Sequence, residues 1–326
     1  MIRTESILLI FIAAALVLAL AVGDQKIMLV HVFGALAGTD QTPAEAVTII
    51  RDFRLPRALM AVLVGVALAT AGAVAQAIMR NPLAEPGLLG INAGAALAAV
   101  IVIIKLENVS TYTLPFLTFA GALAMSAAIY VLAWREGTSS LSIILIGVGL
   151  SAMAGAAAQF IAVFGEIAAL QRAMVWLAGS LQDSRWIKVQ TLFVWLIIPF
   201  AAVWLAAREL DLVALGDDVA AGRGQPVELV RGLMILACAV ISGAAVASAG
   251  LVAFVGLAAP HLARRLVGRR HHRLIPTSAL IGGLMVLVAD IVARNVMPPM
   301  QLPVGLVTAM LGAPFFGFLL WKRRHE

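Results

Sequence analysis

The stretch Arg54–Ala98, RLPRALMAVLVGVALATAGAVAQAIMRNPLAEPGLLGINAGAALA, decides how the chain folds. Residues 57–79 form an apolar run, and a helix needs about 20 such residues to cross a bilayer core of about 30 Å. Glycine and alanine recur along this run, which lets helix backbones approach closely in lipid. Proline and glycine then break the chain between Arg80 and Ala95, and membrane segments tolerate such breaks only where protein or a water-filled path satisfies the backbone. The stretch therefore predicts a closely packed membrane helix followed by a broken one.

The composition of the whole chain is typical of a membrane protein. Of its 326 residues, 62% are hydrophobic and 12% charged, which is far from the composition of soluble globular domains. Apolar runs predict ten helices, at residues 6–23, 57–79, 88–104, 114–134, 141–163, 189–207, 229–249, 251–266, 274–296 and 303–321. The sequence therefore predicts an all-α polytopic membrane protein of about ten transmembrane helices, in a single domain over residues 1–326.

Basic residues predict how the chain crosses the membrane. The first segment follows Arg3 and could be a signal peptide, but Glu5 and the lack of a small-x-small cleavage site favour an uncleaved helix. With a cytoplasmic amino terminus, 14 of the 23 Lys and Arg residues fall at cytoplasmic ends and nine at outer ends, as the positive-inside rule requires. The run RRLVGRRHHR, Arg264–Arg273, contributes much of this bias, and its His271 and His272 are expected to face solvent or lipid phosphate. Both termini are therefore expected in the cytoplasm, and the formal charge of +6 does not call for nucleic acid as a partner.

The motifs of several kinds of active site are missing from the sequence. The single cysteine, Cys238, lies in an apolar run, so we expect a small buried residue and no thiolate metal cluster. The phosphate-binding loop of ATPases needs Gly-Lys-Ser/Thr, and none of the four lysines follows a glycine. His261 has no HExxH or GxSxG motif beside it, which favours a structural or gating role. We therefore expect no enzyme activity, no metal and no bound cofactor, with any ATP and Mg²⁺ used by another chain.

The polar island LGDDVAAGRGQPVE, Leu215–Glu228, lies between two apolar segments. Asp217 and Asp218 could bind Mg²⁺ and a diphosphate, but Ala221 stands where an Asp-Asp-x-x-Asp pattern needs its third carboxylate. The alternative is a short helical turn that is capped by one of these aspartates and ends at a following glycine. Pro226 would then stiffen the entry to the next helix. From the residues alone, a solvated loop and an element that docks on a partner both remain open.

Some charged residues within or beside the apolar segments are candidates for a structural or functional role. Asp290 and Arg294 are four residues apart, which predicts an ion pair within one helix. As a carboxylate inside the membrane, Asp290 is also a candidate proton site, although no second buried carboxylate offers a relay. Arg54 and Arg57 are expected at the outer end of the second helix, either as interfacial anchors or, with Arg294, as a basic face for an acidic partner.

Four long motifs together resemble the permease subunits of type II ABC importers for ferric siderophores, haem and cobalamin, the FecCD-type family. They are Arg54–Ala98, quoted above; RELDLVALGDDVAAGRGQPVE (Arg208–Glu228); GLVAFVGLAAPHLARRLVGRRHHRLIPTSALIGGLMVLVADIVAR (Gly250–Arg294); and QLPVGLVTAMLGAPFF (Gln301–Phe316). The resemblance implies a ten-helix permease fold in a prokaryotic inner membrane. It also implies a second permease subunit, identical or paralogous, a cytoplasmic dimer of ATP-binding cassette ATPases, and an external substrate-binding protein.

The resemblance also implies roles for particular residues. Residues 208–228 correspond to the cytoplasmic coupling loop that docks on the ATPase, with contacts expected at Leu215, Gly216, Asp217, Asp218, Ala220, Ala221, Arg223, Gly224 and Pro226. Arg54, Arg57 and Arg294 match outward arginines that pair with acidic residues of the binding protein. The gate and path correspond to Ser139, Ser140, Leu141, Ser151 and Gln159, and the structural motifs include Asn81, Pro82, Gly87, Gly90, Pro260 and His261.

The chain departs from the family pattern within the coupling loop. Arg223 stands where relatives usually carry a leucine, and it could pair with an acidic residue of the matching ATPase. Gln225 replaces a usual aliphatic residue.

The cargo expected from the resemblance is an iron chelate. WLAGSL (Trp176–Leu181) and RELDLVALGDD are closer to ferric siderophore permeases than to cobalamin ones, and cobalamin or haem import is the alternative. An ion-coupled secondary transporter would instead depend on Asp290, and a membrane transferase or protease would turn over its substrate alone.

Overall fold

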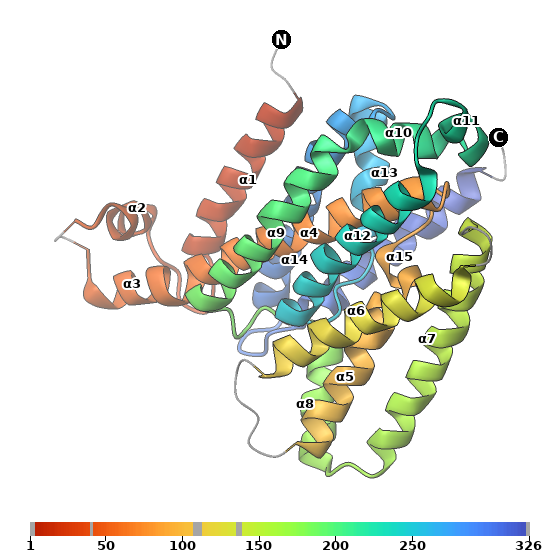
Figure 1. Cartoon of the computed structure of the whole chain (residues 1–326). Coiled ribbons are helices and arrows are strands. Elements are labelled where there is room, and N and C mark those ends of the chain that lie inside the picture. Colours follow the sequence, from red (N-terminus) through yellow and green to blue (C-terminus); the bar gives the residue numbers. More distant parts are fainter. Residues whose placement is uncertain (1–3, 40–41, 107–112, 135–138, 324–326) are drawn as a thin grey trace.

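The computed structural model of the chain describes residues 4–39, 42–106, 113–134 and 139–323. Arg3, Arg135 and the residues after Arg323, which entered the orientation prediction, lie outside these ranges. The described residues form a bundle of helices joined by short turns (Figure 1). The helices are α1 Thr4–Ala21, α2 Leu29–Ala37, α3 Ala44–Thr48, η1 Ile49–Arg54, α4 Leu55–Ile78, η2 Pro86–Leu89, α5 Ile91–Lys105, α6 Thr113–Ala133, α7 Ser140–Val163, α8 Ile167–Leu177, α9 Trp186–Leu205, α10 Ala207–Leu215, α11 Asp217–Gly222, α12 Val227–Ala249, α13 Val255–Val267, α14 His271–Asn295 and α15 Val304–Arg323.

All ten predicted apolar segments are helices. They correspond to α1, α4, α5, α6, α7, α9, α12, α13, α14 and α15. Within the described residues, seven helices are long and apolar enough to cross a membrane: α1, α4 with the preceding α3 and η1, α6, α7, α9, α12 and α14. The other three segments begin or end at proline and glycine breaks, which shorten α5 and α13 to 15 and 13 residues. The polytopic all-α prediction is confirmed.

Helix α4 lies at the centre of the bundle and packs against α9, α12, α13 and α14. Glycine makes this packing possible, because a Cβ atom on Gly65 would overlap the carbonyl oxygen of Gly282 in α14. A Cβ atom on Gly72 would come equally close to the backbone of Gly256 in α13. The small residues predicted to let helices approach therefore sit at backbone contacts. Cys238 of α12 is buried against the same helix, and its thiol donates to Ala71 O at 3.3 Å.

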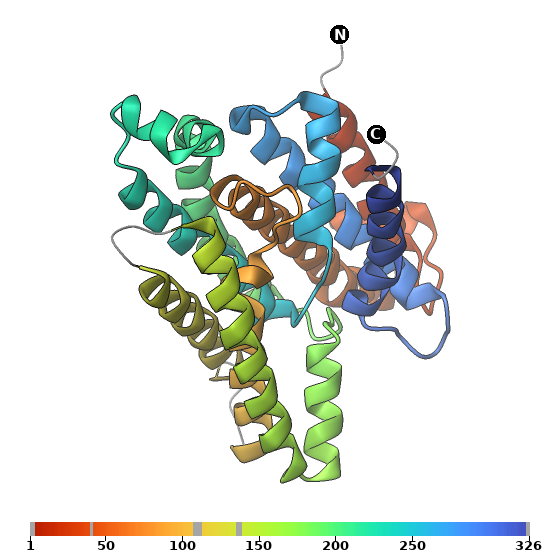
Figure 2. The same cartoon turned by 90° about the vertical axis from the view of Figure 1, so that its right-hand side faces the viewer.

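The sequence prediction missed several short helices. α2, α3 and η1 lie beyond the end of α1, and α8 connects α7 to the turn before α9 (Figure 1). α8 escaped notice because its 11 residues include Gln171 and Arg172, which shorten the apolar run. Figure 2 shows α7 standing at the front of the molecule beside α6, with α15 on the other side.

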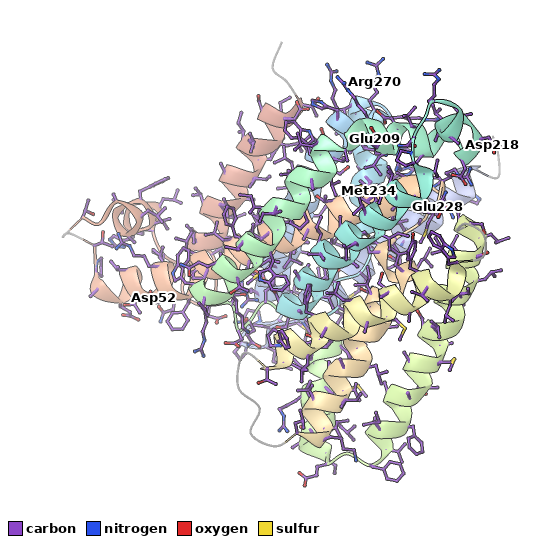
Figure 3. All side chains as sticks on the ribbon, in the orientation of Figure 1. Asp52, Glu209, Asp218, Glu228, Met234 and Arg270 are labelled. Atoms are coloured by element: carbon purple, nitrogen blue, oxygen red, sulfur yellow. The ribbon has the colours of Figure 1, made fainter. Side chains whose placement is uncertain are left out.

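The two ends of the bundle differ in their elements. Figure 3 places Asp52, on η1, and Asp218, on α11, at opposite ends of the molecule. We call these the η1 end and the α11 end. The described ends of the chain, Thr4 and Arg323, lie toward the α11 end, where Arg270 also lies (Figures 1 and 3). The indole N–H of Trp186 donates to Arg51 O at 2.9 Å, which fixes the start of α9 at the η1 end.

Candidate functional site

The η1 end contains a buried carboxylate held by two arginines. Asp290 of α14 is completely buried, and its Oδ1 accepts from Arg57 Nε at 3.0 Å and from Arg57 Nη2 at 2.9 Å. One turn along α14, Arg294 Nε lies 3.2 Å from the other carboxylate oxygen. A carboxylate without partners would be very costly at such a site, so the two guanidinium groups are needed to keep it there.

The third arginine of the cluster is held by backbone carbonyls. Arg54, the last residue of η1, donates to Leu20 O at 2.7 Å and also to Gln25 O, which ties the end of η1 to α1. Arg57 additionally donates from Nη1 to Gln301 Oε1 at 2.6 Å. All three arginines line a pocket of about 370 Å³ together with Asp24 and Ser184 and other residues of the η1 end.

The predicted ion pair between Asp290 and Arg294 is confirmed, but Arg57 is an additional partner that the sequence prediction missed. The arginines also do not form an exposed face: Arg54, Arg57 and Arg294 are only 8%, 9% and 5% exposed. They are buried because Asp290 and the carbonyls at the end of α1 draw their charged groups inward. Their contact with a binding protein stays a prediction. Asp290 is part of a structural ion network, which does not favour its alternative role as a proton relay.

The α11 end presents a short helical corner. α10 and α11 meet at Gly216, whose φ of +119° favours glycine. The predicted helical turn exists, but the predicted aspartate cap is wrong: Gly216 occupies the N-cap position, and Asp217 and Asp218 already lie in the first turn. The reason is that Asp217 has other partners. Its Oδ1 accepts from Arg231 Nη2 of α12 at 2.6 Å, and its Oδ2 lies 3.4 Å from Arg80 Nη2.

Further contacts join this corner to the bundle. Arg231 is 1% exposed and also pairs with Glu228 at 2.8 Å. Asp211 of α10 accepts from the backbone N–H of His271, and its carboxylate lies 2.6 Å from the His271 ring. The expectation that His271 faces solvent or lipid is therefore wrong, because its ring is buried against α10. Through Arg80, Arg231 and His271, the corner contacts the ends of α4, α12 and α14.

The outer surface of the corner is open. Leu215 and Val219 are 68% and 46% exposed, and Arg223, one turn further on, is also exposed. Asp218, Ala221, Gly224 and Pro226 are exposed too, whereas Ala220 is buried against the bundle. Figure 3 shows Asp218 at the edge of the molecule. Gln225 points inward and donates to the carbonyl and carboxylate oxygens of Glu209, which gives its amide nitrogen partners at a buried position.

The broken segment after α4 is a compact turn. Asn81 Oδ1 accepts from Leu83 N at 2.9 Å, with Pro82 between them, and η2 follows with Gly87 inside it. Gly90 has φ +71° and packs so closely on Ile129 and Met125 that a Cβ atom would overlap them. Burial raises the pKa of the Glu85 carboxyl in this turn above its usual value.

The segment around Pro260 is a continuous helix rather than a turn. This proline is buried within the short helix α13, and His261 follows it, half-buried. The gating role considered for His261 stays a prediction.

The predicted gate residues lie at the start of α7. Ser139 caps the helix by accepting from Ser142 N at 3.0 Å, and Ser140 Oγ donates to Ile78 O at 3.1 Å, which joins α7 to the end of α4. Leu141 and Gln159 are exposed and Ser151 is half-buried on α7, a helix in which most residues are not buried. The structure thus places these residues on an open apolar face, and their part in a path stays a prediction.

The described helices form a polytopic membrane protein with a buried charge network at one end and an exposed helical corner at the other, an arrangement that fits a transport permease. Comparison with known families gives the same answer: the model of the FecCD transport family matches residues 8–322. The chain belongs to the FecCD transport family.

Individual relatives agree with this assignment. The chain is 41% identical over 281 residues, 84% of each protein, to the iron(3+)-hydroxamate import system permease protein FhuG of Bacillus subtilis (strain 168). It is 41% identical over 274 residues, 83% of this chain and 81% of the other, to the Fe(3+)-citrate import system permease protein YfmE of the same organism. A solved inward-facing structure described as a metal-chelate type ABC transporter matches with a TM-score of 0.88, at 29% identity and 98% coverage of both chains.

Proposed function

We propose that this chain is the permease subunit of an ATP-binding cassette importer that carries a ferric siderophore into the cytoplasm. The observation that carries the proposal is the exposed α10–α11 corner, which is built on α4, α12 and α14 and is available to a partner. Family membership and the hydroxamate and citrate permeases among the relatives support iron chelates as cargo. ATP is hydrolysed by a separate ATPase dimer, because the sequence contains no Gly-Lys-Ser/Thr loop.

The proposed orientation places the α11 end and both termini in the cytoplasm and the η1 end outside. The basic run before α14 lies at the α11 end, where Figure 3 shows Arg270, as the positive-inside rule favours. In this orientation the arginine pocket faces the external binding protein. A second copy of the permease, or a paralogue, covers the open apolar face of α7 and completes the path.

Helix α4 gives the two ends a direct connection. Arg57 lies in its first turn and Arg80 lies two residues beyond its last residue, Ile78, so its 24 residues span about 36 Å between the pocket and the corner. We propose that closure of the ATPases moves the corner, and that α4 and α14 carry this motion through the bundle. The importer then shifts between outward and inward states without the permease holding its cargo tightly.

The corner is tested by reconstituting the permease with its ATPase and binding protein. Arg223→Glu should abolish stimulation of ATP hydrolysis by the loaded binding protein, because it reverses an exposed charge at the proposed contact. Ala220→Pro should do the same by disrupting α11. Gly222→Ala is the control, since a Cβ atom there meets nothing within 4 Å. Unchanged stimulation in the first two variants would reject the corner as the ATPase contact.

The pocket is tested without reversing the charge of Arg57 or Arg294, because these two side chains pair with the buried carboxylate of Asp290. Arg54→Gln removes a charge that binds only backbone carbonyls, so the Asp290 network stays intact. We expect binding-protein affinity to fall several-fold and to depend less on salt, as measured by titration at two ionic strengths. Equal affinity and equal salt dependence in both proteins would reject the pocket as a docking site.

The cargo is tested by uptake in cells that lack their own permease of this class. Cells that receive this importer should accumulate iron from a hydroxamate or citrate chelate, and the uptake should stop when the ATPase is inactivated. Uptake of haem or cobalamin alone would identify the alternative cargo. Uptake that survives ATPase loss would indicate ion-coupled transport.

A further inference from the structure

A separate groove opens at the η1 end, between α6 and α9, with α12 as its floor. Its volume is about 360 Å³, and its lining is mostly apolar, including Phe116, Phe119, Leu192, Trp195 and Ala244. Phe119 and Trp195 meet edge to face, with ring centroids 4.5 Å apart. Figure 1 shows α6, α9 and α12 running side by side on one face of the bundle. Phe116 and Trp195 are 66% and 41% exposed there, on two helices that are long and apolar enough to cross a membrane.

Two cations lie at the rim of this groove. Lys188 and Arg185 both line it, and both pair with one carboxylate, Asp183, at 2.8 Å and 3.2 Å. Two positive charges facing one negative charge leave the rim with one net positive charge. These partners hold the pKa of Asp183 below its usual value even though burial alone would raise it.

The positions of these groups match the layers of a bilayer. Trp186 lies between the two cations in sequence, and tryptophan is enriched at membrane interfaces. Trp195 lies seven residues below Lys188 on α9, about 10 Å deeper along the helix. A ligand would therefore meet cations at headgroup level and aromatic rings at the level of the upper acyl chains.

We propose that this groove is a binding site for one phospholipid with an anionic headgroup. The lipid phosphate binds Lys188 and Arg185, and an acyl chain lies along Phe116, Phe119 and Trp195. The charge surplus at the rim selects an anionic headgroup over a zwitterionic one, because basic residues beside membrane helices attract anionic lipids. The site lies away from the α11 corner, and the proposal requires only that the chain spans a membrane, so it does not depend on the proposed function.

The experiment uses the purified full-length chain in detergent and two lipids with brominated acyl chains, a phosphatidylglycerol and a phosphatidylcholine. Bromine quenches nearby tryptophan fluorescence, and Trp195→Phe identifies the share of quenching that arises in the groove. We expect half-maximal quenching of Trp195 at an about fivefold lower mole fraction of phosphatidylglycerol, the effect of one net charge near a membrane. Equal quenching by the two lipids would overturn the proposal.

Substitutions at the rim test the charge selection in both directions. Arg185→Gln with Lys188→Gln should remove or reverse the preference, whereas Asp183→Asn should strengthen it by removing the competing carboxylate. Lys105→Gln is the matched control, because Lys105 is an exposed cation at the end of α5 outside the groove. A preference that survives the double substitution, or falls equally in the Lys105 control, would overturn the proposal. Thermal unfolding of each variant shows whether the fold is retained.

Discussion

The arginine pocket and the α10–α11 corner are both charged, but they use their charges in opposite ways. In the pocket, Arg57 and Arg294 turn inward to Asp290, which is completely buried. At the corner, the inward pairs involve Asp217 and Arg231, while Leu215 and Val219 remain exposed. The charges of the pocket are therefore occupied by internal contacts, whereas the corner exposes apolar side chains that a proposed partner could contact.

This difference teaches that charge alone does not identify a docking surface. Removing one partner of a buried ion pair leaves an uncompensated charge, whereas a substitution on an exposed face changes stability little. Substitutions of the buried charges in the pocket should therefore lower stability more than partner binding. Substitutions on the exposed side of the corner should lower partner binding more than stability.

The largest expected effect on stability comes from Asp290→Ala. It leaves two buried guanidinium groups without their carboxylate, so the free energy of unfolding should fall by about 3–5 kcal/mol. Thermal unfolding in detergent measures this loss. The combined substitution of Asp290, Arg57 and Arg294 by Leu, Met and Leu should recover much of it, because replacing a whole buried ion network by apolar residues is often neutral. A stable single variant would contradict the network.

The second effect concerns α4, which joins the two sites. Gly72→Ala forces a Cβ atom into the backbone of α13 at Gly256, so we expect a loss of about 1–3 kcal/mol from overpacking. Gly149→Ala on α7 is the matched control, because a Cβ atom there meets nothing within 4 Å. Similar unfolding temperatures for these two variants would show that α4 is not closely packed on α13.

A smaller effect is expected at the inward side of the corner. Asp217→Ala removes one partner of Arg231, but Glu228 remains 2.8 Å away, so the loss should be about 1–2 kcal/mol. Exchange of the backbone amide hydrogens in α11 should increase more than that in α14. Equal protection of α11 in the variant and the unchanged chain would show that Asp217 does not hold this helix.

The smallest effect on stability is expected at Val219→Ser. Val219 is 46% exposed, so unfolding should change by less than about 0.5 kcal/mol. Binding of the ATPase should nevertheless weaken, because the substitution removes apolar contact area from the corner. Co-purification of the ATPase with each variant measures this. Unweakened ATPase binding would show that the apolar side of the corner is not the contact.

Hydrophobic runs were sufficient to predict the ten main helices, since each reaches membrane length or is cut by a visible proline or glycine. The short turn at Asp217 and the ion pair of Asp290 with Arg294 were also accessible, because both depend on residues within one turn of each other. The ion pair between Arg57 and Asp290 could not be predicted in this way, since the two residues are 233 positions apart in the sequence. A lone carboxylate in an apolar helix signalled that a cation must be near, but not which one.

The sequence by itself determined that the chain is a bundle of membrane helices, because apolar length and small residues suffice for a helix to enter and pack in lipid. It also determined where several helices begin or end, because proline and glycine change the backbone conformation at their own positions. The tertiary structure alone decided that the three arginines are buried, that His271 pairs with Asp211 and that Asp217 holds Arg231 instead of capping its helix. The physical reason is that a charged side chain pairs with groups within a few ångströms of it, and only the packing of the helices brings residues distant in sequence that close.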